Sequence, residues 1–361
     1  MSLSDALQIL FWVVVSVVGG WWVVFGYWRL RSEITRRSEG EAPLRSSRQL
    51  IWRDPGSISA ADLEAGPCGS HGAPAPPFHF VEEHDTGSQP CVSIRDAAGH
   101  EWRVKWGHEV HTETFGTRLA WALGYFAEPT YFLASGTIEG TRDLRRAKAC
   151  IDAEQRFTDA RFELSEPDVK RHFDAHGWAW HDNPFVGTRE LSGLKILMML
   201  MSNWDNKDVR DVSRGSNTAI FEYQVKPVAS AFRRTVSDAR EARYLIIDWG
   251  AALGAWGNNV LQRGRWDPEA FAGQNAQFVT GVSGDLVQFG YQGQRTADLT
   301  ANITRADVAW FVGIANRLTD DHLRGALRAS GATRDEVDLF TAALRARLDQ
   351  LRDAAASTAP W

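Results

Sequence analysis

The feature that most constrains this chain is an uncharged run close to its N-terminus. Residues 6–28 read ALQILFWVVVSVVGGWWVVFGYW, 23 residues without Asp, Glu, Lys or Arg. A helix of this length, at about 1.5 Å per residue, crosses the hydrocarbon core of a bilayer. Helices of soluble proteins rarely stay apolar on every face over such a length. We therefore expect residues 1–28 to form a transmembrane anchor, in which 6–28 contacts the lipid bilayer.

Charges beside the run predict its orientation. Six arginines follow it within residues 29–48, and no Lys or Arg precedes it. Basic flanks of membrane helices stay in the cytoplasm. The three cysteines, an odd number without CxxC spacing, also fit a reducing compartment. We expect a single-pass protein of a bacterial inner membrane, with its C-terminal domain in the cytoplasm.

Composition places the rest of the chain among ordinary globular proteins. Charged residues make up 24% and hydrophobic residues 44% of the sequence, which excludes a disordered chain. The net charge of -5 gives no basic surface of the kind that nucleic-acid binding requires. We expect no nucleic-acid partner.

The sequence after the anchor predicts a linker and a two-lobed α+β domain. Residues 29–77 are rich in Arg, Ser, Gly and Pro and show no sustained period, which predicts a juxtamembrane linker. The roughly 300 residues that remain suit two lobes that share a cleft. We place a small β-rich N-lobe at 78–140 and a mainly helical C-lobe with inserts at 141–355.

Periodicity predicts the elements of the N-lobe. The segments PCVSIRD (90–96) and EWRVKWG (101–107) alternate apolar and polar residues on either side of a turn, which is typical of a β-hairpin. A helix is expected over 111–125, with an apolar stripe formed by Phe115, Leu119, Ala122 and Leu123. The segment TYFLASGTIEG predicts a further strand.

The C-lobe is expected to be mainly helical. A charged, helix-rich insert is expected over 141–182, and the segment 191–202 (LSGLKILMMLMS) predicts a helix buried on all sides. Two strands are expected at 218–224 and 244–247. Helical periodicity returns over 304–352.

Four charged residues occur in a notable order on these elements. Lys105 ends the second hairpin strand, and Glu113 lies in the helix after it. Asp205 lies in the loop SNWDNKD after the buried helix, and Asp248 follows a hydrophobic strand in LIIDWGAALG. This layout resembles the protein-kinase-like fold, especially atypical branches such as HipA-like and phosphoinositide-kinase-like enzymes. The resemblance covers most of the chain after residue 78 and implies that ATP and Mg²⁺ are cofactors.

The resemblance implies nucleotide-binding roles in the N-lobe. Lys105 would hold the α- and β-phosphates, and Glu113 would pair with its ammonium group. Glu109 is the alternative partner, since spacing alone does not decide between the two. Gly87 and Ser88 precede the first hairpin strand and would form the turn that covers the phosphates.

The resemblance also implies roles in the C-lobe. Asp205 would orient or deprotonate the acceptor hydroxyl, and Lys207 would neutralise charge on the transferring phosphoryl group. Asp248 would chelate Mg²⁺, because Gly250 lets the backbone turn beside it.

One position departs from the family pattern. Arg210 stands five residues past Asp205, where a metal-binding asparagine is expected. Asn217 is a candidate replacement because it directly precedes a strand, as the family's asparagine does. Asp208 and Asp211 are alternatives.

Two functions follow from this pattern. The first is an ATP-dependent phosphotransferase at the cytoplasmic membrane face, which acts on the hydroxyl of an unknown protein or small molecule. The second is a catalytically inactive kinase-like module, tethered to the membrane, that binds or scaffolds partners. The departure at Arg210 favours the second function, and the joint presence of Lys105, Asp205, Lys207 and Asp248 favours the first.

Protease protection tests the predicted anchor. We expect protease added outside intact cells to leave the C-terminal domain whole, and to digest it once the membrane is opened, because the six arginines keep the domain inside. A variant that lacks residues 1–28 serves as the control and should leave the membrane fraction. Digestion from outside, or a freely soluble full-length protein, would contradict the prediction.

Overall fold

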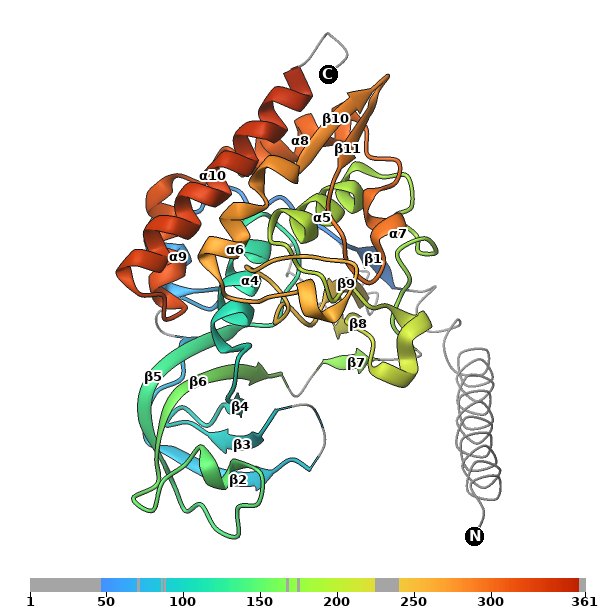
Figure 1. The fold of residues 1–361 in the computed structure, drawn as a ribbon. Coiled ribbons are helices and arrows are strands. Elements are labelled where there is room, and N and C mark those ends of the chain that lie inside the picture. Colours follow the sequence, from blue (N-terminus) through green and yellow to red (C-terminus); the bar gives the residue numbers. More distant parts are fainter. Residues whose placement is uncertain are drawn as a thin grey trace, which may run out of the picture.

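The computed structural model describes residues 47–69, 72–85, 87, 89–166, 169–173, 176–224 and 240–356. They form a mixed α+β fold of two lobes, a β-barrel and a mainly helical lobe, with one helix between them (Figure 1). The membrane helix predicted over 6–28 lies outside these residues. Among the helices that the structure does describe, none is long and apolar enough to cross a bilayer.

The smaller lobe is a closed barrel of five strands in the order β2-β3-β4-β6-β5. The strands are β2 (Phe78–Glu83), β3 (Cys91–Arg95), β4 (Glu101–Lys105), β5 (Thr130–Glu139) and β6 (Arg156–Ser165). The predicted hairpin is confirmed as the antiparallel pair β3 and β4, with Cys91 opposite Lys105. Because side chains alternate along a strand, Trp102 and Val104 fill the barrel core.

Strand β6 lies where the sequence predicted helices. It pairs with both β4 and β5 and completes the barrel, so the barrel extends to residue 165 and the N-lobe boundary expected at 140 is wrong. The segment RFTDARFELS falls within the charged, helix-rich insert predicted over 141–182. However, Phe162 packs in the barrel core while its neighbours Arg161 and Glu163 are buried on the opposite face. This alternation is the pattern of a strand.

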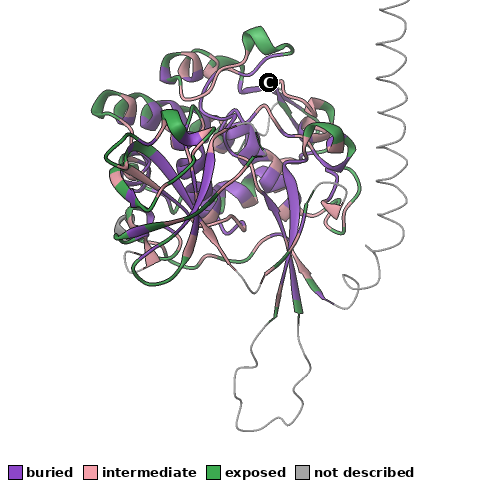
Figure 2. Ribbon diagram, turned by 90° about the horizontal axis from the view of Figure 1, so that it is seen from below, coloured by how far each residue is buried: buried purple, intermediate pink, exposed green. Residues whose placement is uncertain are grey.

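The larger lobe surrounds a buried helix, α5 (Arg189–Leu200), which confirms the helix predicted over 191–202. Beside α5 lies a four-stranded sheet in the order β1-β9-β8-β7, formed by β1 (Arg48–Leu50), β9 (Arg240–Ile246), β8 (Thr218–Gln224) and β7 (Lys170–His172). Around them lie α6 (Pro268–Gly273), β10 (Val279–Ser283), β11 (Leu286–Phe289), α7 (Thr296–Thr300), α8 (Arg305–Ala315), α9 (Asp320–Ala329) and α10 (Arg334–Ala356). The last three confirm the helical C-terminal region. Figure 2 shows buried residues concentrated along the strands and the central helices.

The described part of the expected linker is packed onto the domain. Strand β1 pairs in parallel with β9, and α3 (Ala60–Ala65) packs against α9. Ile51 and Leu63 are both buried. The expectation of a linker is therefore wrong for these residues. The sequence did not reveal β1 and α3, because elements this short contain too few apolar residues to produce a visible period.

Helix α4 (Val110–Ala122) joins the two lobes and confirms the helix predicted over 111–125. Its expected apolar stripe is buried. A Cβ atom added at Gly116 would lie 2.6 Å from Cβ of Trp249, so the absence of a side chain allows this close approach. Thr112 Oγ1 also donates a hydrogen bond to the carbonyl oxygen of Gly250 (3.0 Å). Helix α4 therefore positions the segment that follows β9.

Substitution of Gly116 tests this contact. Gly116→Ala should destabilise the protein by about 1–3 kcal/mol, because the methyl group overlaps the Trp249 side chain. Gly313→Ala is the matched control in α8, where an added Cβ meets no atom within 4 Å. That change should stabilise the protein by up to about 1 kcal/mol, the helix propensity of Ala over Gly. Urea unfolding measures both, and equal stability of the two variants would show that α4 and Trp249 are not in tight contact.

Candidate active site

A cavity of about 230 Å³ lies where the barrel, α4 and the segment after β9 meet. Five of the eight predicted site residues line it: Gly87, Lys105, Glu113, Asn217 and Asp248. Ser88 lies outside the described residues, and Asp205 and Lys207 are not among the lining residues. Most of the predicted site residues, which are far apart in the sequence, therefore line one cavity.

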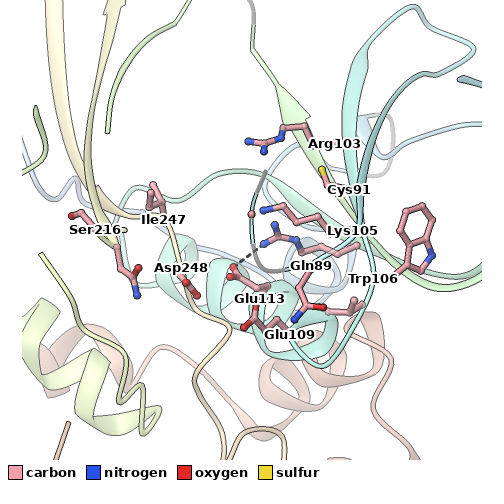
Figure 3. A pocket seen from close by; sticks show the side chains of 14 residues that line it. Gln89, Cys91, Arg103, Lys105, Trp106, Glu109, Glu113, Ser216, Ile247 and Asp248 are labelled. Carbon is pink, nitrogen blue, oxygen red and sulfur yellow. Dashed lines mark ion pairs between the residues drawn. The ribbon is translucent and has the colours of Figure 1, made fainter. Parts of the chain in front are cut away.

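Basic side chains form the barrel wall of this cavity. Arg103 and Lys105 lie on β4 (Figure 3). Arg161 is opposite Lys105 on β6, so all three project from one face of the barrel. The side chain of Lys105 makes no hydrogen bond or ion pair with any described residue. Nε of Arg103 is buried and has no hydrogen-bond partner within the described chain. This wall therefore offers donors that an anionic ligand can use.

The ion-pair partner of Glu113 is Arg161, whereas the sequence predicted Lys105. Nη1 of Arg161 lies 2.9 Å from Glu113 Oε2, and its Nη2 lies 2.8 Å from Glu163 Oε2. The predicted pairing of Lys105 with Glu113 is therefore not observed. The alternative partner, Glu109, instead pairs with Arg265 at 2.5 Å. Lys105 remains available because the longer, forked guanidinium of Arg161 already binds Glu113.

Two carboxyl groups, those of Glu113 and Asp248, line the cavity beside the basic wall, and Glu113 is in contact with Arg161 of that wall. The side chains of Glu113 and Asp248 lie near each other in Figure 3. Burial raises the pKa of Glu113 well above its usual range, and the charge of Asp248 adds to this effect while Arg161 opposes it. The backbone N–H of Gly250 donates to Asp248 Oδ1 (2.9 Å) and orients that carboxylate. Such a pair is stabilised by a shared proton or a divalent cation, and its oxygen ligands suit Mg²⁺.

Asn217 also lines the cavity, and its side-chain amide oxygen is a third potential metal ligand. Its Nδ2 donates a hydrogen bond to the carbonyl oxygen of Asp205. The backbone carbonyl oxygen of Asn217 accepts a hydrogen bond from the backbone N–H of Ile247 (3.0 Å), one residue before Asp248. Asn217 therefore connects the loop of Asp205 to the strand end that bears Asp248.

Arg210 lies outside the cavity wall. Its Nη2 lies 2.5 Å from both Asp208 Oδ2 and Asp298 Oδ2. These two aspartates form a group of potential metal ligands with His181, but the guanidinium of Arg210 already bridges the carboxylates. Asp211, the other alternative ligand, pairs with Arg295 and Arg214. Arg210 thus neutralises acids beside the loop and does not occupy the site between Glu113 and Asp248.

Asp205 is partly buried and interacts electrostatically with Asp248, which lines the cavity. Its Oδ2 lies 3.2 Å from Nζ of Lys207, and its Oδ1 accepts a hydrogen bond from Gln294 Nε2 (3.3 Å). Burial raises the pKa of Asp205, the negative charge of Asp248 raises it further, and Lys207 lowers it. The two predicted catalytic side chains therefore form one ion pair that is electrostatically coupled to Asp248.

Sequence reasoning missed two cations of the barrel wall. Arg103 could have been found, because it lies two residues before Lys105 on a strand and must project from the same face. Arg161 could not, because only the pairing of β6 with β4 places it opposite Lys105.

Comparisons with known proteins give a limited result. No protein-family model matches the chain, and no curated protein matches it. Among solved structures, the chain is similar to the crystal structure of the Golgi casein kinase, at 11% identity and a TM-score of 0.35, over 79% of this chain and 73% of that one. It is also similar to the Golgi casein kinase with Mn/ADP bound, at 11% identity and a TM-score of 0.34, over 78% and 73% of the two chains. At this level of similarity, the interpretation of the cavity depends on its own geometry.

Separate removal of the two cations tests the observed pairing. Arg161→Met should destabilise the protein by about 3–5 kcal/mol, because it leaves Glu113 and Glu163 buried without their partner. Lys105→Met should cost under about 1 kcal/mol, because Lys105 has no ion pair to lose. Urea unfolding at neutral pH measures both changes. A larger loss for Lys105→Met would mean that Lys105 is the true partner of Glu113.

Proposed function

We propose that this chain is a kinase-like phosphotransferase that uses ATP and Mg²⁺. One observation carries the proposal: a single cavity is lined both by basic side chains, among which Lys105 has no ion pair within the described chain, and by the carboxyl groups of Glu113 and Asp248. Triphosphate needs cations on one side, and its metal needs carboxylate oxygens on the other. The acceptor is the hydroxyl group of a protein or a small molecule.

The barrel supplies the phosphate contacts in this proposal. Lys105 and Arg103 bind the phosphate oxygens, since the ammonium group of Lys105 and Nε of Arg103 have no hydrogen-bond partner within the described chain, although Nη1 of Arg103 pairs with Glu163 (3.8 Å). Gly87 lies in the turn between β2 and β3 with φ of 95°, and it lines the same cavity. A turn without a side chain at this position lets the backbone approach the phosphates closely.

The carboxylate side would hold the metal ion. Asp248, Glu113 and Asn217 supply oxygen ligands of the kind that Mg²⁺ binds. When bound, Mg²⁺ would neutralise charge on the phosphates and orient them. Arg161 keeps Glu113 in place during binding, because the ion pair of Arg161 with Glu163 on β6 holds its guanidinium.

Asp205 is the group that receives the acceptor proton. In the reaction, a bond forms between the acceptor oxygen and the γ-phosphorus, the bond from that phosphorus to the β-phosphate oxygen breaks, and ADP leaves. The hydroxyl proton passes to Asp205, whose raised pKa favours this transfer. Lys207, 3.2 Å from Asp205, offsets negative charge on the phosphoryl group.

A second candidate function is a kinase-like module without catalysis. The observation that favours it is the placement of Asp205, whose carboxylate is held by Lys207 and Gln294 and is not among the cavity-lining residues. Such a module binds MgATP and scaffolds partners without transferring phosphate.

The predicted anchor adds a location to either function. Residues 6–28 carry no charge and are followed by six arginines, which supports a domain held at the cytoplasmic face of a bacterial inner membrane. Acceptors would then be proteins or small molecules that reach this surface.

Two aspartate substitutions separate the proposed roles. Asp248→Asn should abolish the rise in melting temperature caused by ATP with Mg²⁺, because a metal ligand is lost. Asp205→Asn should retain that rise but lower phosphoryl transfer by about 100-fold or more, because no group accepts the proton. The thermal shift and transfer of labelled γ-phosphate to itself, to a protein or to water are measured on the same preparations.

Asp298→Asn is the matched control, because this aspartate pairs with Arg210 and is not among the lining residues. It should keep both binding and transfer. A wild-type protein that binds MgATP but transfers phosphate to no acceptor would support the catalytically inactive module. Absence of any MgATP-dependent shift in the wild type would reject both functions.

A further inference from the structure

Arg347 of α10 is a cation that is completely buried. Its relative exposure is 0%, and within the described chain it forms no ion pair with any carboxylate. Burial lowers the pKa of its guanidinium well below the usual range for arginine. Unpaired charges are rarely kept in a protein interior, because removing them from water is costly. The contacts that compensate for this cost therefore indicate what Arg347 does.

Every nitrogen of the guanidinium donates a hydrogen bond to a neutral oxygen. Nη1 donates to the carbonyl oxygen of Leu200 (2.8 Å) and to Ser202 Oγ (2.8 Å). Nη2 donates to the carbonyl oxygen of Phe271 (2.9 Å), and Nε donates to Asn275 Oδ1 (2.8 Å). One side chain thus joins the end of α5 to α6 and the residues after it.

Aromatic rings enclose the same guanidinium. Its central carbon lies 3.7 Å from the ring centroid of Phe271, 4.8 Å from that of Trp256 and 5.3 Å from that of Phe278. Ring faces attract a cation and also exclude water. The guanidinium therefore has little freedom to move, and the oxygens that it binds are held with it.

The hydrogen bonds to Leu200 and Ser202 lie at the start of the loop that bears Asp205. Leu200 is the last residue of α5, where carbonyl oxygens lack helical partners and the helix dipole is negative. Ser202 has a φ of 56°, in the left-handed region, so the chain turns sharply there. A cation at this point satisfies the free carbonyl oxygen and fixes the turn.

The loop is also tied to the segment after Asp248. The backbone N–H of Trp204 donates to the carbonyl oxygen of Ala251 (3.2 Å), and that of Leu253 donates to Met201 (2.8 Å). A shift at Ser202 would therefore displace the loop relative to this segment. It would leave the barrel wall with Lys105 unaffected, because Arg347 contacts no strand of the barrel.

We propose that Arg347 is a positioning residue that sets the start of the Asp205 loop and so places the Asp205 carboxylate for transfer. The effect on transfer rests on the proposed function, whereas the effect on the loop does not. The structure therefore assigns a role in catalysis to the C-terminal helix, which contacts the end of α5 and Ser202 through Arg347.

Hydrogen exchange and enzyme assays test the proposal together. The variants are Arg347→Lys, which keeps the charge but cannot bridge the same oxygens, and Arg347→Met, which removes the charge. The control is Arg345→Met on the same helix, whose side chain pairs with Asp320 away from α5. We expect amides of Asn203 and Trp204 to exchange about tenfold faster in both Arg347 variants and unchanged in the control.

The expected enzymatic effect is confined to transfer. Affinity for MgATP should stay within about twofold of the wild type, and the transfer rate should fall by about 10- to 100-fold, because a small displacement of a reacting group has an effect of this size. A merely structural role would instead lower binding and folded fraction together. Unchanged exchange at Asn203 and Trp204, equal effects in the Arg345 control, or failure of both Arg347 variants to fold would overturn the proposal. If the wild type shows no transfer at all, the proposed function fails, and faster exchange in the loop still supports the positioning role.

Discussion

The geometry of the candidate site depends on one buried guanidinium shared by two carboxylates. Arg161 on β6 binds Glu163 beside it and Glu113 on α4, so the barrel and the helix between the lobes are joined by charge-assisted hydrogen bonds. Because Arg161 takes Glu113, the ammonium group of Lys105 keeps no partner in the described chain. The carboxyl group of Glu113 also interacts electrostatically with Asp248. The pairing of Arg161 with Glu113 leaves Lys105 as a cavity-lining cation without an ion pair in the described chain.

Helix α4 transmits this arrangement to the larger lobe. Its Gly116 allows close contact with Trp249, and its Thr112 donates a hydrogen bond to the carbonyl oxygen of Gly250. The segment that bears Asp248 is therefore positioned by a helix that the barrel itself holds. The Asp205 loop has a separate support, because Arg347 binds the end of α5 from within the helical lobe. Two buried arginines thus hold the two halves of the site, one through carboxylates and the other through neutral oxygens.

Strong local patterns made much of the fold predictable. The hairpin, α4, α5 and β8 each have a clear period or a fully apolar surface, and the structure confirms them. Strand β6 was mistaken for part of a helical insert, because its charged face is buried by contacts that lie outside its own sequence. The packed segment at 47–69 was mistaken for a linker, since β1 and α3 are stable only against β9 and α9. Errors occurred where an element depends on distant partners.

The sequence by itself determined the order of the site residues and the strands and helices that carry them. Alternation in β4 places Lys105 on a defined face, and the strand before Asp248 places that carboxylate at its end. Only the tertiary structure decided which charges meet: Arg161 with Glu113, and Arg347 with the end of α5. The physical reason is that an ion pair or a buried hydrogen bond depends on distance in space. The sequence pattern fixes each side chain only relative to its own element, while closure of the barrel and packing of α10 set the distances between elements.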